Sequence, residues 1–556
     1  MRIFLAQQNY HIGNFELNAQ KIIDAIQQAI EQKGDLIVFS ELAICGYPPR
    51  DFLEFADFID KCYETIERIK PLTQNIAVLV GSPSKNNTPK GKNLHNSAWF
   101  IHEGAVKAIV NKTLLPTYDV FDEYRYFEPA NEWNVIDFKG KKLAVTICED
   151  IWNLTEDPQY RITPMDELMH QQPDLMINLS ASPFNYFQHE NRMTIIKNNV
   201  RTYGLPMVYC NAVGSQTEIV FDGGSMVMDE NEQVALELPA FQEGLVYCDL
   251  ELGKEIKSKA EGTIDPLVQL ATLDAERGID KIYSALITGI KDYFGKMGFK
   301  KAIVASSGGI DSALVLTLAC HALGAENVTA LLMPSQFSTD HSVNDAVELS
   351  KNLNNEYHTL PIKDIFGAFE TTLEPVFNGL PFNVAEENLQ SRIRGALVMA
   401  MSNKFGTILL NTSNKSELAT GYGTLYGDMA GGLGVLGDLY KVQVYALSRY
   451  INRNGVVIPQ NIIDKAPSAE LRPGQKDSDS LPDYEVLDAV LFQYIEKRKG
   501  PEEIIAMGFD AALVQRVLKL VNTNEYKRNQ FCPIIRVSPK AFGIGRRVPI
   551  VGKYLS

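Results

Sequence analysis

The sequence has no run of about 18 apolar residues, and this absence excludes a membrane-spanning helix. Its seven cysteines are odd in number and scattered, so no disulfide framework is indicated and a reducing compartment is expected. The chain has 53 Lys and Arg residues against 68 Asp and Glu residues, and the net charge of −15 argues against a general nucleic-acid binder. The opening MRIFLAQQNY lacks the apolar core of a signal peptide. We therefore expect a cytoplasmic protein without membrane or nucleic-acid partners.

Length and residue pattern indicate α/β domains. The 556 residues suggest roughly two to four domains, and 45% hydrophobic with 22% charged residues is typical of globular proteins. Short strand-like runs alternate with helical patterns in both halves, and the second half restarts with a helix expected at 275–296. Between the halves, around residues 250–266, charge rises and apolar content falls, and we place a linker at 256–274. We predict domains at 1–255 and 275–556, joined by this linker and each built around a covered sheet.

Three expected strands in the first half end in reactive side chains, namely Glu41, Lys112 and Cys148. Catalytic groups gather at the carboxyl ends of strands. A thiol can attack a carbonyl carbon, a carboxylate can take the thiol proton, and an ammonium group can stabilise the thiolate and the oxyanion. A cysteine after an apolar strand is more often only a small buried residue. The prediction of acyl-transfer chemistry therefore depends on the three residues together.

The segments around these residues, FSELAICGYPPRD, NKTLLPTYDVFDEYRYF and VTICEDIW, resemble motifs of the nitrilase (carbon–nitrogen hydrolase) superfamily, and most of all its glutaminase branch. The resemblance covers roughly residues 1–250. It implies an α-β-β-α sandwich in which Glu41, Lys112 and Cys148 form a catalytic triad. It also implies that glutamine is a substrate.

The same resemblance assigns glutamine binding to Tyr118, to Ser182 in NLSASPF, and to Gln188. At the position of Gln188 the branch commonly has a basic residue for the glutamine carboxylate, so this chain departs from the pattern. Arg192 is the alternative cation that we consider for that carboxylate.

The second half opens with a Ser- and Gly-rich turn, SSGGIDS, between a strand-like and a helix-like run. Gly308 and Gly309 let the backbone approach phosphate oxygens, and the N–H groups at a helix N-terminus donate to them. The Lys-[Ser/Thr] pair of a Walker loop is missing, and Asp311 stands in this region instead. A carboxylate repels phosphate but is a good ligand for Mg²⁺. The turn therefore predicts a phosphate site with a cation beside it.

The turn matches the Ser-Gly-Gly-x-Asp-Ser loop of the N-type ATP pyrophosphatases. This resemblance implies an α/β domain with a parallel sheet, in which ATP is cleaved to AMP and pyrophosphate. It assigns ATP binding to Ala305, Ser306, Ser307, Gly308, Gly309, Ile310, Asp311 and Ser312. The later segments EENLQSRIRG, LLNTSNKSELATGYGTLYGDMAGG, PSAELRPGQKDSDSLPDYE and NEYKRNQ narrow the resemblance to the glutamine-dependent NAD synthetase family.

The family resemblance implies further ligand contacts at matching positions. Those for ATP are Thr412, Lys441 and Ser468. Those for deamido-NAD are Asn388, Arg392, Glu417 and Lys527. Those for Mg²⁺, the cofactor it implies beside the co-substrate ATP, are Asp311 and Glu417. A homo-oligomer is also implied.

Together the halves predict a ligase that frees ammonia from glutamine at one site and uses it at a second, where ATP has adenylated deamido-NAD. Ammonia in bulk water is mostly protonated, so a sequestered passage between the sites is expected. Two alternatives stay open. One is another glutamine-fed ATP pyrophosphatase with a different product. The other is a first domain that serves only regulation or assembly, with ammonia taken from solution.

The C-terminal segment, residues 529–556, carries five basic residues and no Asp or Glu. Two interpretations stay open for it. It is either a flexible basic end or a segment that folds over an anionic dinucleotide or a partner subunit.

Overall fold

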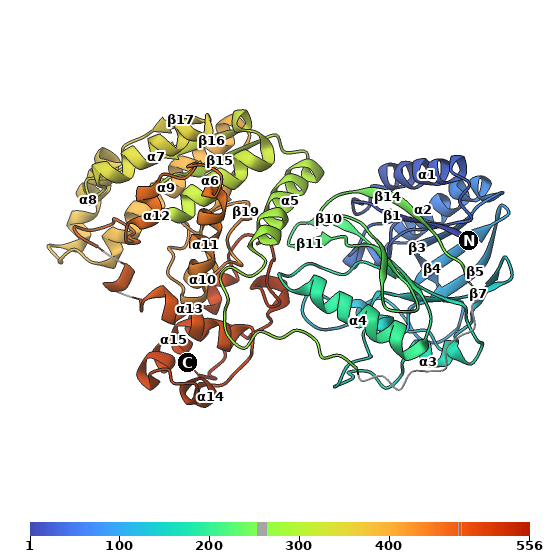
Figure 1. Ribbon diagram of the computed structural model, residues 1–556. Coiled ribbons are helices and arrows are strands. Elements are labelled where there is room, and N and C mark those ends of the chain that lie inside the picture. The colour runs from blue at the N-terminus through green and yellow to red at the C-terminus, as the bar shows by residue number, and fades with distance from the viewer. Residues whose placement is uncertain (253–263, 476, 480, 556) are drawn as a thin grey trace. The chain divides into compact units, whose positions relative to one another are not determined.

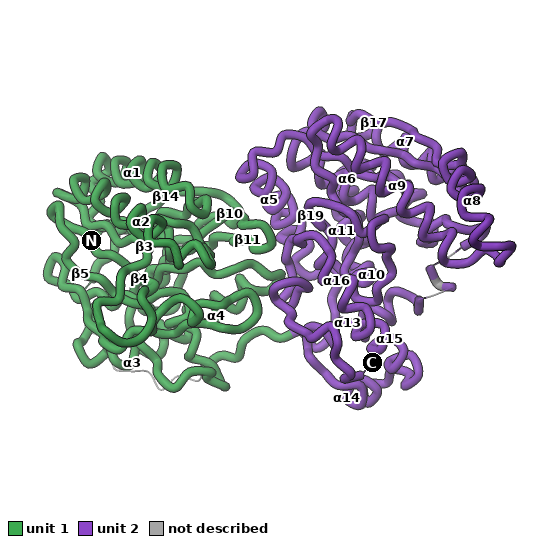
Figure 2. The backbone as a smooth tube through the Cα atoms, turned by 180° about the vertical axis from the view of Figure 1, so that it is seen from behind, with its two compact units in different colours: residues 1–269 green, residues 270–556 purple. Residues whose placement is uncertain are grey.

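The computed structural model describes residues 1–252, 264–475, 477–479 and 481–555. The chain divides into two compact units, residues 1–269 and 270–556, which Figure 2 colours green and purple. The predicted linker, 256–274, spans this division, and its part up to residue 263 lies outside the described residues. Among the described residues, no helix is both long enough and apolar enough to cross a membrane.

The first unit contains two six-stranded sheets (Figure 1). The strand order of the first sheet is β14 (Gly244–Asp249), β1 (Arg2–Gln7), β2 (Leu36–Val38), β3 (Ala77–Lys85), β4 (Leu94–His102) and β5 (Ala105–Asn111). The order of the second is β13 (Val234–Glu237), β12 (Met226–Met228), β9 (Met207–Asn211), β8 (Leu175–Ser180), β7 (Lys141–Ile147) and β6 (Ile136–Phe138). A small ribbon pairs β10 (Val213–Gln216) with β11 (Ile219–Asp222).

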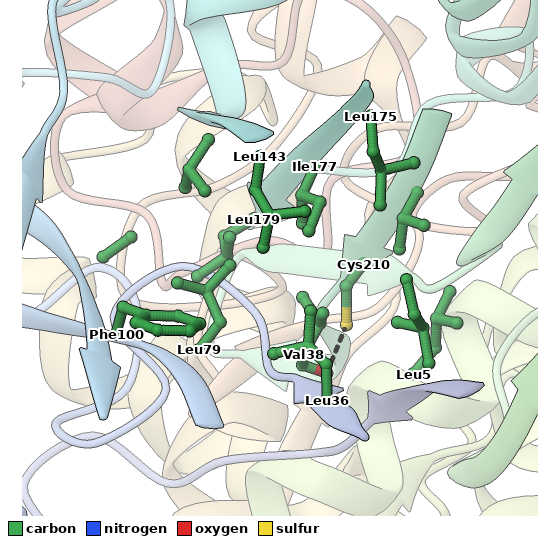
Figure 3. Packing of buried hydrophobic residues seen from close by; sticks show 14 of the residues in the cluster. Leu5, Leu36, Val38, Leu79, Phe100, Leu143, Leu175, Ile177, Leu179 and Cys210 are labelled. Carbon is green, nitrogen blue, oxygen red and sulfur yellow. Dashed lines mark hydrogen bonds between the residues drawn. The ribbon is translucent and has the colours of Figure 1, made fainter. Parts of the chain in front are cut away.

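The core of this unit lies between the two sheets. Figure 3 shows Leu36, Val38 and Phe100 of the first sheet facing Leu175 and Ile177 of the second. Side chains alternate between the faces of a strand, so every second residue of β8 enters this core while the others reach the opposite face. Both faces of β8 are covered, which is why its first three residues are all apolar.

Helices cover the outer faces of both sheets and complete the predicted α-β-β-α sandwich. They are α1 (Phe15–Glu31), α2 (Ala56–Ile69), α3 (Pro164–Met169) and α4 (Gln188–Tyr203). Short 3-10 turns add η1 (Arg50–Glu54), η2 (Lys70–Thr73), η3 (Glu123–Arg125) and η4 (Cys148–Ile151). Helical spacing predicts four isoleucines on one face of α1, and of these Ile22 and Ile26 are buried, Ile23 is half-buried and Ile30 is exposed.

The second unit is built on a five-stranded sheet in which every pair of neighbours is parallel. The strand order is β17 (Glu356–Thr359), β16 (Val328–Leu332), β15 (Lys301–Ala305), β18 (Thr407–Asn411) and β19 (Leu433–Gly434). After β15 the chain adds β16 and β17 on one side of that strand, and β18 then pairs with its other side. In open α/β sheets, ligands bind at the carboxyl ends of the strands where this reversal occurs.

Helices surround this sheet, as predicted for an α/β domain. The first group is α5 (Ile279–Met297), α6 (Ile310–Leu323), α7 (Asp340–Leu353), α8 (Lys363–Phe377), α9 (Val384–Phe405), α10 (Lys415–Thr420), α11 (Lys441–Asn452) and α12 (Gln460–Asp464). Helix α5 begins four residues after the predicted start at 275, because Gly278 precedes it in a left-handed conformation. Helix α6 is apolar on nearly all sides, since it is buried against neighbours rather than lying at the surface.

A second group of helices forms its own apolar cluster toward the C-terminus. These helices are α13 (Tyr484–Ile495), α14 (Pro501–Ala506), α15 (Ala511–Thr523) and α16 (Glu525–Arg528). The unit also has the 3-10 turns η5 (Ala325–Asn327), η6 (Asp477–Asp479) and η7 (Gly543–Gly545).

The basic C-terminal segment packs on the second unit itself. The buried Arg536 guanidinium donates to the carbonyl oxygens of Ser538 and Pro539 at 3.1 and 3.0 Å. The Arg546 guanidinium donates to Glu525 Oε2 at 2.7 Å. The interpretation of a flexible end is therefore wrong as far as residue 546, because these cations are used in internal contacts.

Candidate active sites

The structure brings the three predicted residues of the first unit together. Glu41 follows β2, Lys112 follows β5 and Cys148 follows β7, and the exposed fraction of each is 6% or less. Lys112 Nζ donates to Glu41 Oε1 at 2.7 Å. Glu41 and Lys112 also act on the pKa of the Cys148 thiol through space. One thiol, one carboxylate and one ammonium group thus share a buried site.

A second buried carboxylate, Glu123, belongs to the same cluster and was not predicted from sequence. Its oxygens accept hydrogen bonds from Lys112 Nζ at 2.8 and 2.9 Å, and from the Tyr47 hydroxyl at 2.7 Å. Asn96 Nδ2 donates to Glu41 Oε1 at 2.7 Å. The signal that could have found Glu123 is the segment FDEYRYF, but other acidic residues lie close to it in the sequence, and the sequence alone does not show which of them is buried.

The electrostatics of this cluster favour a neutral thiol and a charged lysine at rest. Burial, and next the Glu41 carboxylate, raise the pKa of Cys148 well above its usual value, although Lys112 acts to lower it. Burial lowers the pKa of Lys112, but Glu123 and Glu41 outweigh this effect and raise it overall. The thiol therefore needs a base at the moment of attack, and Glu41 is the carboxylate that the sequence predicts for this task.

The predicted glutamine residues lie on neighbouring segments. Gln188 Nε2 donates to Ser182 Oγ at 3.3 Å. The Tyr118 hydroxyl donates to Glu149 at 2.9 Å, and the Tyr160 hydroxyl donates to the same carboxylate at 3.1 Å. Burial raises the pKa of Glu149 to about 7. A carboxylate directly after the nucleophile, held by two tyrosines, was not predicted from sequence.

The suggestion that Arg192 anchors the glutamine carboxylate is wrong. Its side chain is fully buried, and its two Nη atoms donate to the two carboxylate oxygens of Asp222 at 3.1 and 2.7 Å. Nη1 also donates to the Gly223 carbonyl oxygen at 3.1 Å. A guanidinium that already has a buried partner does not leave it for a ligand at low cost.

The second unit contains a cavity of about 300 Å³ at the carboxyl ends of β15 and β18. All of the predicted ATP residues except Gly308 line it, as does Glu417: Ala305, Ser306, Ser307, Gly309, Ile310, Asp311, Ser312, Thr412, Lys441 and Ser468. This is the position at which the strand order reverses, so the sheet topology and the sequence motif select the same place.

The loop between β15 and α6 is fixed by hydrogen bonds of its own serines. Ser307 N donates to Ser312 Oγ at 3.2 Å, and Ser312 Oγ donates to the Gly309 carbonyl oxygen at 3.0 Å. Gly308 has a φ of +77°, and a Cβ there would lie 2.1 Å from the Ser342 carbonyl oxygen. The loop and the first turn of α6 can therefore present N–H groups to an anion at close range.

One lysine lies between the two predicted metal carboxylates. Lys441 Nζ donates to Asp311, lies 3.7 Å from Glu417 Oε1, and is nearly fully buried. Asn414 Nδ2 donates to Asp311 Oδ1 at 2.9 Å. Burial, and next the Asp311 charge, raise the pKa of Glu417 to about 8. Within the described part of the chain, no group of three or more His, Cys, Asp or Glu residues is arranged to hold a metal ion.

The predicted deamido-NAD residues outside this cavity meet at one loop, residues 421–426. The Thr424 hydroxyl donates to Asn388 Oδ1 at 2.7 Å, and Arg392 Nε donates to the Leu425 carbonyl oxygen at 3.3 Å. Lys527 Nζ donates to the carbonyl oxygens of Gly421 and Gly423 at 2.7 and 2.8 Å. Two helices far apart in the sequence, α9 and α16, thus present polar side chains to one loop.

Two family models match the chain, and they divide it between them. The carbon-nitrogen hydrolase model matches residues 2–259, and the NAD synthase model matches residues 282–531. The glutamine-dependent NAD(+) synthetase of Synechocystis sp. is 44% identical over 555 residues, which are 99% of this chain and 98% of that protein. The enzyme of the same name from Thermotoga maritima is 40% identical over 582 residues, 100% and 99% of the two chains.

A solved structure agrees with these sequence matches. Glutamine-dependent NAD+ synthetase from Acinetobacter baumannii, in complex with adenosine diphosphate, is 37% identical and superposes with a TM-score of 0.76. The match covers 100% of this chain and 99% of that chain. Both units, in the same order and over the full length, thus have the same relatives. The chain belongs to the glutamine-dependent NAD(+) synthetase family.

Proposed function

We propose that this protein makes NAD from deamido-NAD, using ATP for activation and the amide of glutamine as the nitrogen source. The observation that carries the proposal is the presence, in one chain, of the buried cluster of Cys148, Glu41 and Lys112 and of a separate cavity built on the SSGGIDS loop. The products are NAD, AMP, pyrophosphate and glutamate.

At the first site, Cys148 Sγ attacks the amide carbon of glutamine while Glu41 takes the thiol proton. The carbon–nitrogen bond breaks, the same proton passes to the leaving nitrogen, and ammonia departs from a glutamyl thioester. Water then cleaves the thioester to glutamate. Lys112, kept charged by two carboxylates, stabilises the oxyanion formed in each step.

The polar groups near Cys148 suit the two charged ends of glutamine. Ser182 and Gln188 offer neutral donors for the α-carboxylate, in place of the basic residue common in this branch. Glu149 offers a negative charge for the α-ammonium group. Tyr118 contributes to substrate binding by holding this carboxylate in place.

At the second site, a carboxylate oxygen of deamido-NAD attacks the α-phosphorus of ATP, and pyrophosphate leaves. Activation is required because a carboxylate is a poor electrophile and hydroxide a poor leaving group. Ammonia then attacks the acyl carbon, AMP leaves, and one proton is released to give the neutral amide. Asn388, Arg392 and Lys527 bind deamido-NAD near the 421–426 loop. Passage of ammonia between the sites without release into water belongs to the same proposal.

The carboxylates of Asp311 and Glu417 fit a Mg²⁺ ion. Mg²⁺ prefers oxygen ligands and is usually held by one or two carboxylates together with substrate phosphates, so two protein carboxylates are enough. When bound, such an ion neutralises charge on the phosphate oxygens of ATP. Lys441 balances the charge of the same two side chains.

The test is NAD formation from deamido-NAD, ATP and Mg²⁺, with glutamine or ammonium chloride as nitrogen source. We expect Cys148→Ala to abolish synthesis from glutamine and to keep synthesis from ammonia. Cys62→Ala, at a buried cysteine in α2, is the matched control and should keep both activities.

Other results would decide between the alternatives. Wild-type protein that forms no NAD from either source would contradict the proposal and favour another glutamine-fed ATP pyrophosphatase. Wild-type protein that uses ammonia but not glutamine would indicate that the first unit serves regulation or assembly.

A further inference from the structure

Among the described residues, three basic side chains line the cavity of the second unit, namely Lys441, Lys465 and Arg394. Two of them already have carboxylate partners. Lys441 lies between Asp311 and Glu417, as described above, and Lys465 Nζ lies 3.4 Å from Asp345 Oδ2. The third, Arg394, has no such partner among the residues that the structure describes.

One hydrogen bond from Nε fixes the Arg394 side chain, and the two Nη atoms of its guanidinium group stay available for a ligand. Its Nε donates to the Met333 carbonyl oxygen at 3.0 Å, at the carboxyl end of β16. Among the described residues, neither Nη atom has a hydrogen-bond partner, and no carboxylate forms an ion pair with the group. Burial lowers the pKa of Arg394 to about 10, so the group stays charged at neutral pH although it is poorly solvated.

The nearby carboxylates are engaged elsewhere. Glu470 accepts hydrogen bonds from the hydroxyls of Ser342 and Thr339 at 2.6 and 3.0 Å. Asp428 accepts from Thr424 N at 2.6 Å. A partly buried cation without a paired anion is stabilised when a negatively charged ligand enters the same cavity.

Helix α9 carries Arg394 between the two substrate regions. Ser391, Arg394 and Val398, at helical spacing, line the cavity that holds the predicted ATP residues. Asn388 and Arg392, on a different face of the same helix, reach the 421–426 loop. Arg394 therefore lies on the helix that carries both cavity-lining residues beside the proposed ATP site and the proposed deamido-NAD residues.

We propose that the Arg394 guanidinium binds the non-bridging oxygens of the α-phosphate while that phosphate moves from ATP to the carboxylate of deamido-NAD. This inference rests on the proposed function and adds a catalytic residue to it. In the step, a carboxylate oxygen forms a bond to the α-phosphorus, the bond to the bridging oxygen of pyrophosphate breaks, and no proton is transferred. The planar group offers two parallel N–H donors, which matches a pair of phosphate oxygens.

The test isolates this step by measuring pyrophosphate released in a single turnover with ATP and deamido-NAD, without glutamine or ammonia. We expect Arg394→Met to slow release about 100-fold, the order seen when one donor to transition-state charge is lost. Arg394→Lys keeps the charge but not the paired donors, and should be slowed about tenfold. Guanidinium ion added to Arg394→Met should restore part of the rate. Lys404→Met, at the exposed last turn of α9, is the matched control.

Glutamine hydrolysis without ATP belongs to the first unit and each variant should keep it, while a cooperative thermal unfolding transition close to that of wild type reports the integrity of the second unit, which carries Arg394. Release by Arg394→Met within about threefold of wild type would overturn the proposal, as would a slow Arg394→Met that guanidinium ion does not improve. If Arg394→Met does not fold, Arg394→Lys decides the matter, and a wild-type rate in that variant overturns the proposal. Failure of the proposed function looks different, because wild-type protein then forms no NAD.

Discussion

Cys148 occupies a left-handed backbone conformation, with a φ of +44°, directly after β7. A non-glycine residue in this conformation is strained by roughly 1–3 kcal/mol, and the surrounding contacts must hold it there. Asp150 does so, since its carboxylate accepts hydrogen bonds from the backbone N–H groups of Thr113, Leu114 and Ile147. The thiol at this turn lies close enough to the buried Glu41 and Lys112 for both charges to act on its pKa.

Glu149 leads to a prediction about pH at the scale of one residue. Burial raises its pKa from the ordinary 4.5 to about 7, so between these values the folded protein holds a proton that the unfolded chain has released. The side chain therefore costs no stability at low pH and becomes destabilising as pH rises toward 7. We expect Glu149→Gln to raise the free energy of unfolding relative to wild type, and this gain should be larger at pH 8 than at pH 5 by roughly 1–3 kcal/mol.

Tryptophan fluorescence during denaturation measures this effect selectively, because Trp99, Trp133 and Trp152 all lie in the first unit. Glu156→Gln, at an exposed glutamate, should change the pH dependence by less than about 0.5 kcal/mol. Equal pH dependence in wild type and Glu149→Gln would show that this carboxyl keeps an ordinary pKa.

At the scale of elements, the turn between β15 and α6 tolerates no side chain at Gly308. The positive φ and the 2.1 Å approach to the Ser342 carbonyl oxygen both oppose a Cβ. We expect Gly308→Ala to destabilise the second unit by about 1–3 kcal/mol. Ammonia-driven synthesis should fall more than about tenfold, since the displaced loop no longer matches the phosphate chain.

Calorimetry and steady-state kinetics test this expectation, and the control is a glycine at which a Cβ can be added without a clash. A Cβ on Gly295, in the exposed part of α5, would meet no atom within 4 Å. Gly295→Ala should therefore stabilise the protein by about 0.5–1 kcal/mol and keep its activity. Normal activity in Gly308→Ala would mean that the loop does not approach the phosphates closely.

At the scale of the whole molecule, the two units carry different chemistry on separate sheets. Asp311 lies in the second unit, where its carboxylate accepts from Lys441 and Asn414. We expect Asp311→Asn to reduce NAD synthesis at least about 100-fold with either nitrogen source, because the variant weakens a carboxylate that we propose as a ligand of the metal–nucleotide complex. Basal hydrolysis of glutamine, measured as glutamate without ATP, should continue.

The exposed Asp364→Asn, in α8, is the control for this variant and should keep both activities. Asp311→Asn that retains synthesis from ammonia would remove this carboxylate from the reaction. Loss of basal glutamine hydrolysis would contradict the separation of the two sites.

The sequence by itself determined the fold class, the order of the two halves and the motif residues. Short buried strands and amphipathic helices can be predicted directly from the spacing of apolar residues, because each face of an element either contacts the core or does not. Glu41, Lys112, Cys148 and the SSGGIDS loop stand at strand ends, where a functional side chain interrupts an apolar run.

Only the tertiary structure decided which polar residues share a site. Glu123, Glu149 and Arg394 resemble their neighbours in sequence, and their roles depend on partners that are distant along the chain or on the lack of a partner. In the same way, the ion pair with Asp222, thirty residues away, excludes Arg192 as the anchor of the glutamine carboxylate. A charge in a sequence carries no record of its burial or of its partner, and these two quantities set its energy and its chemistry.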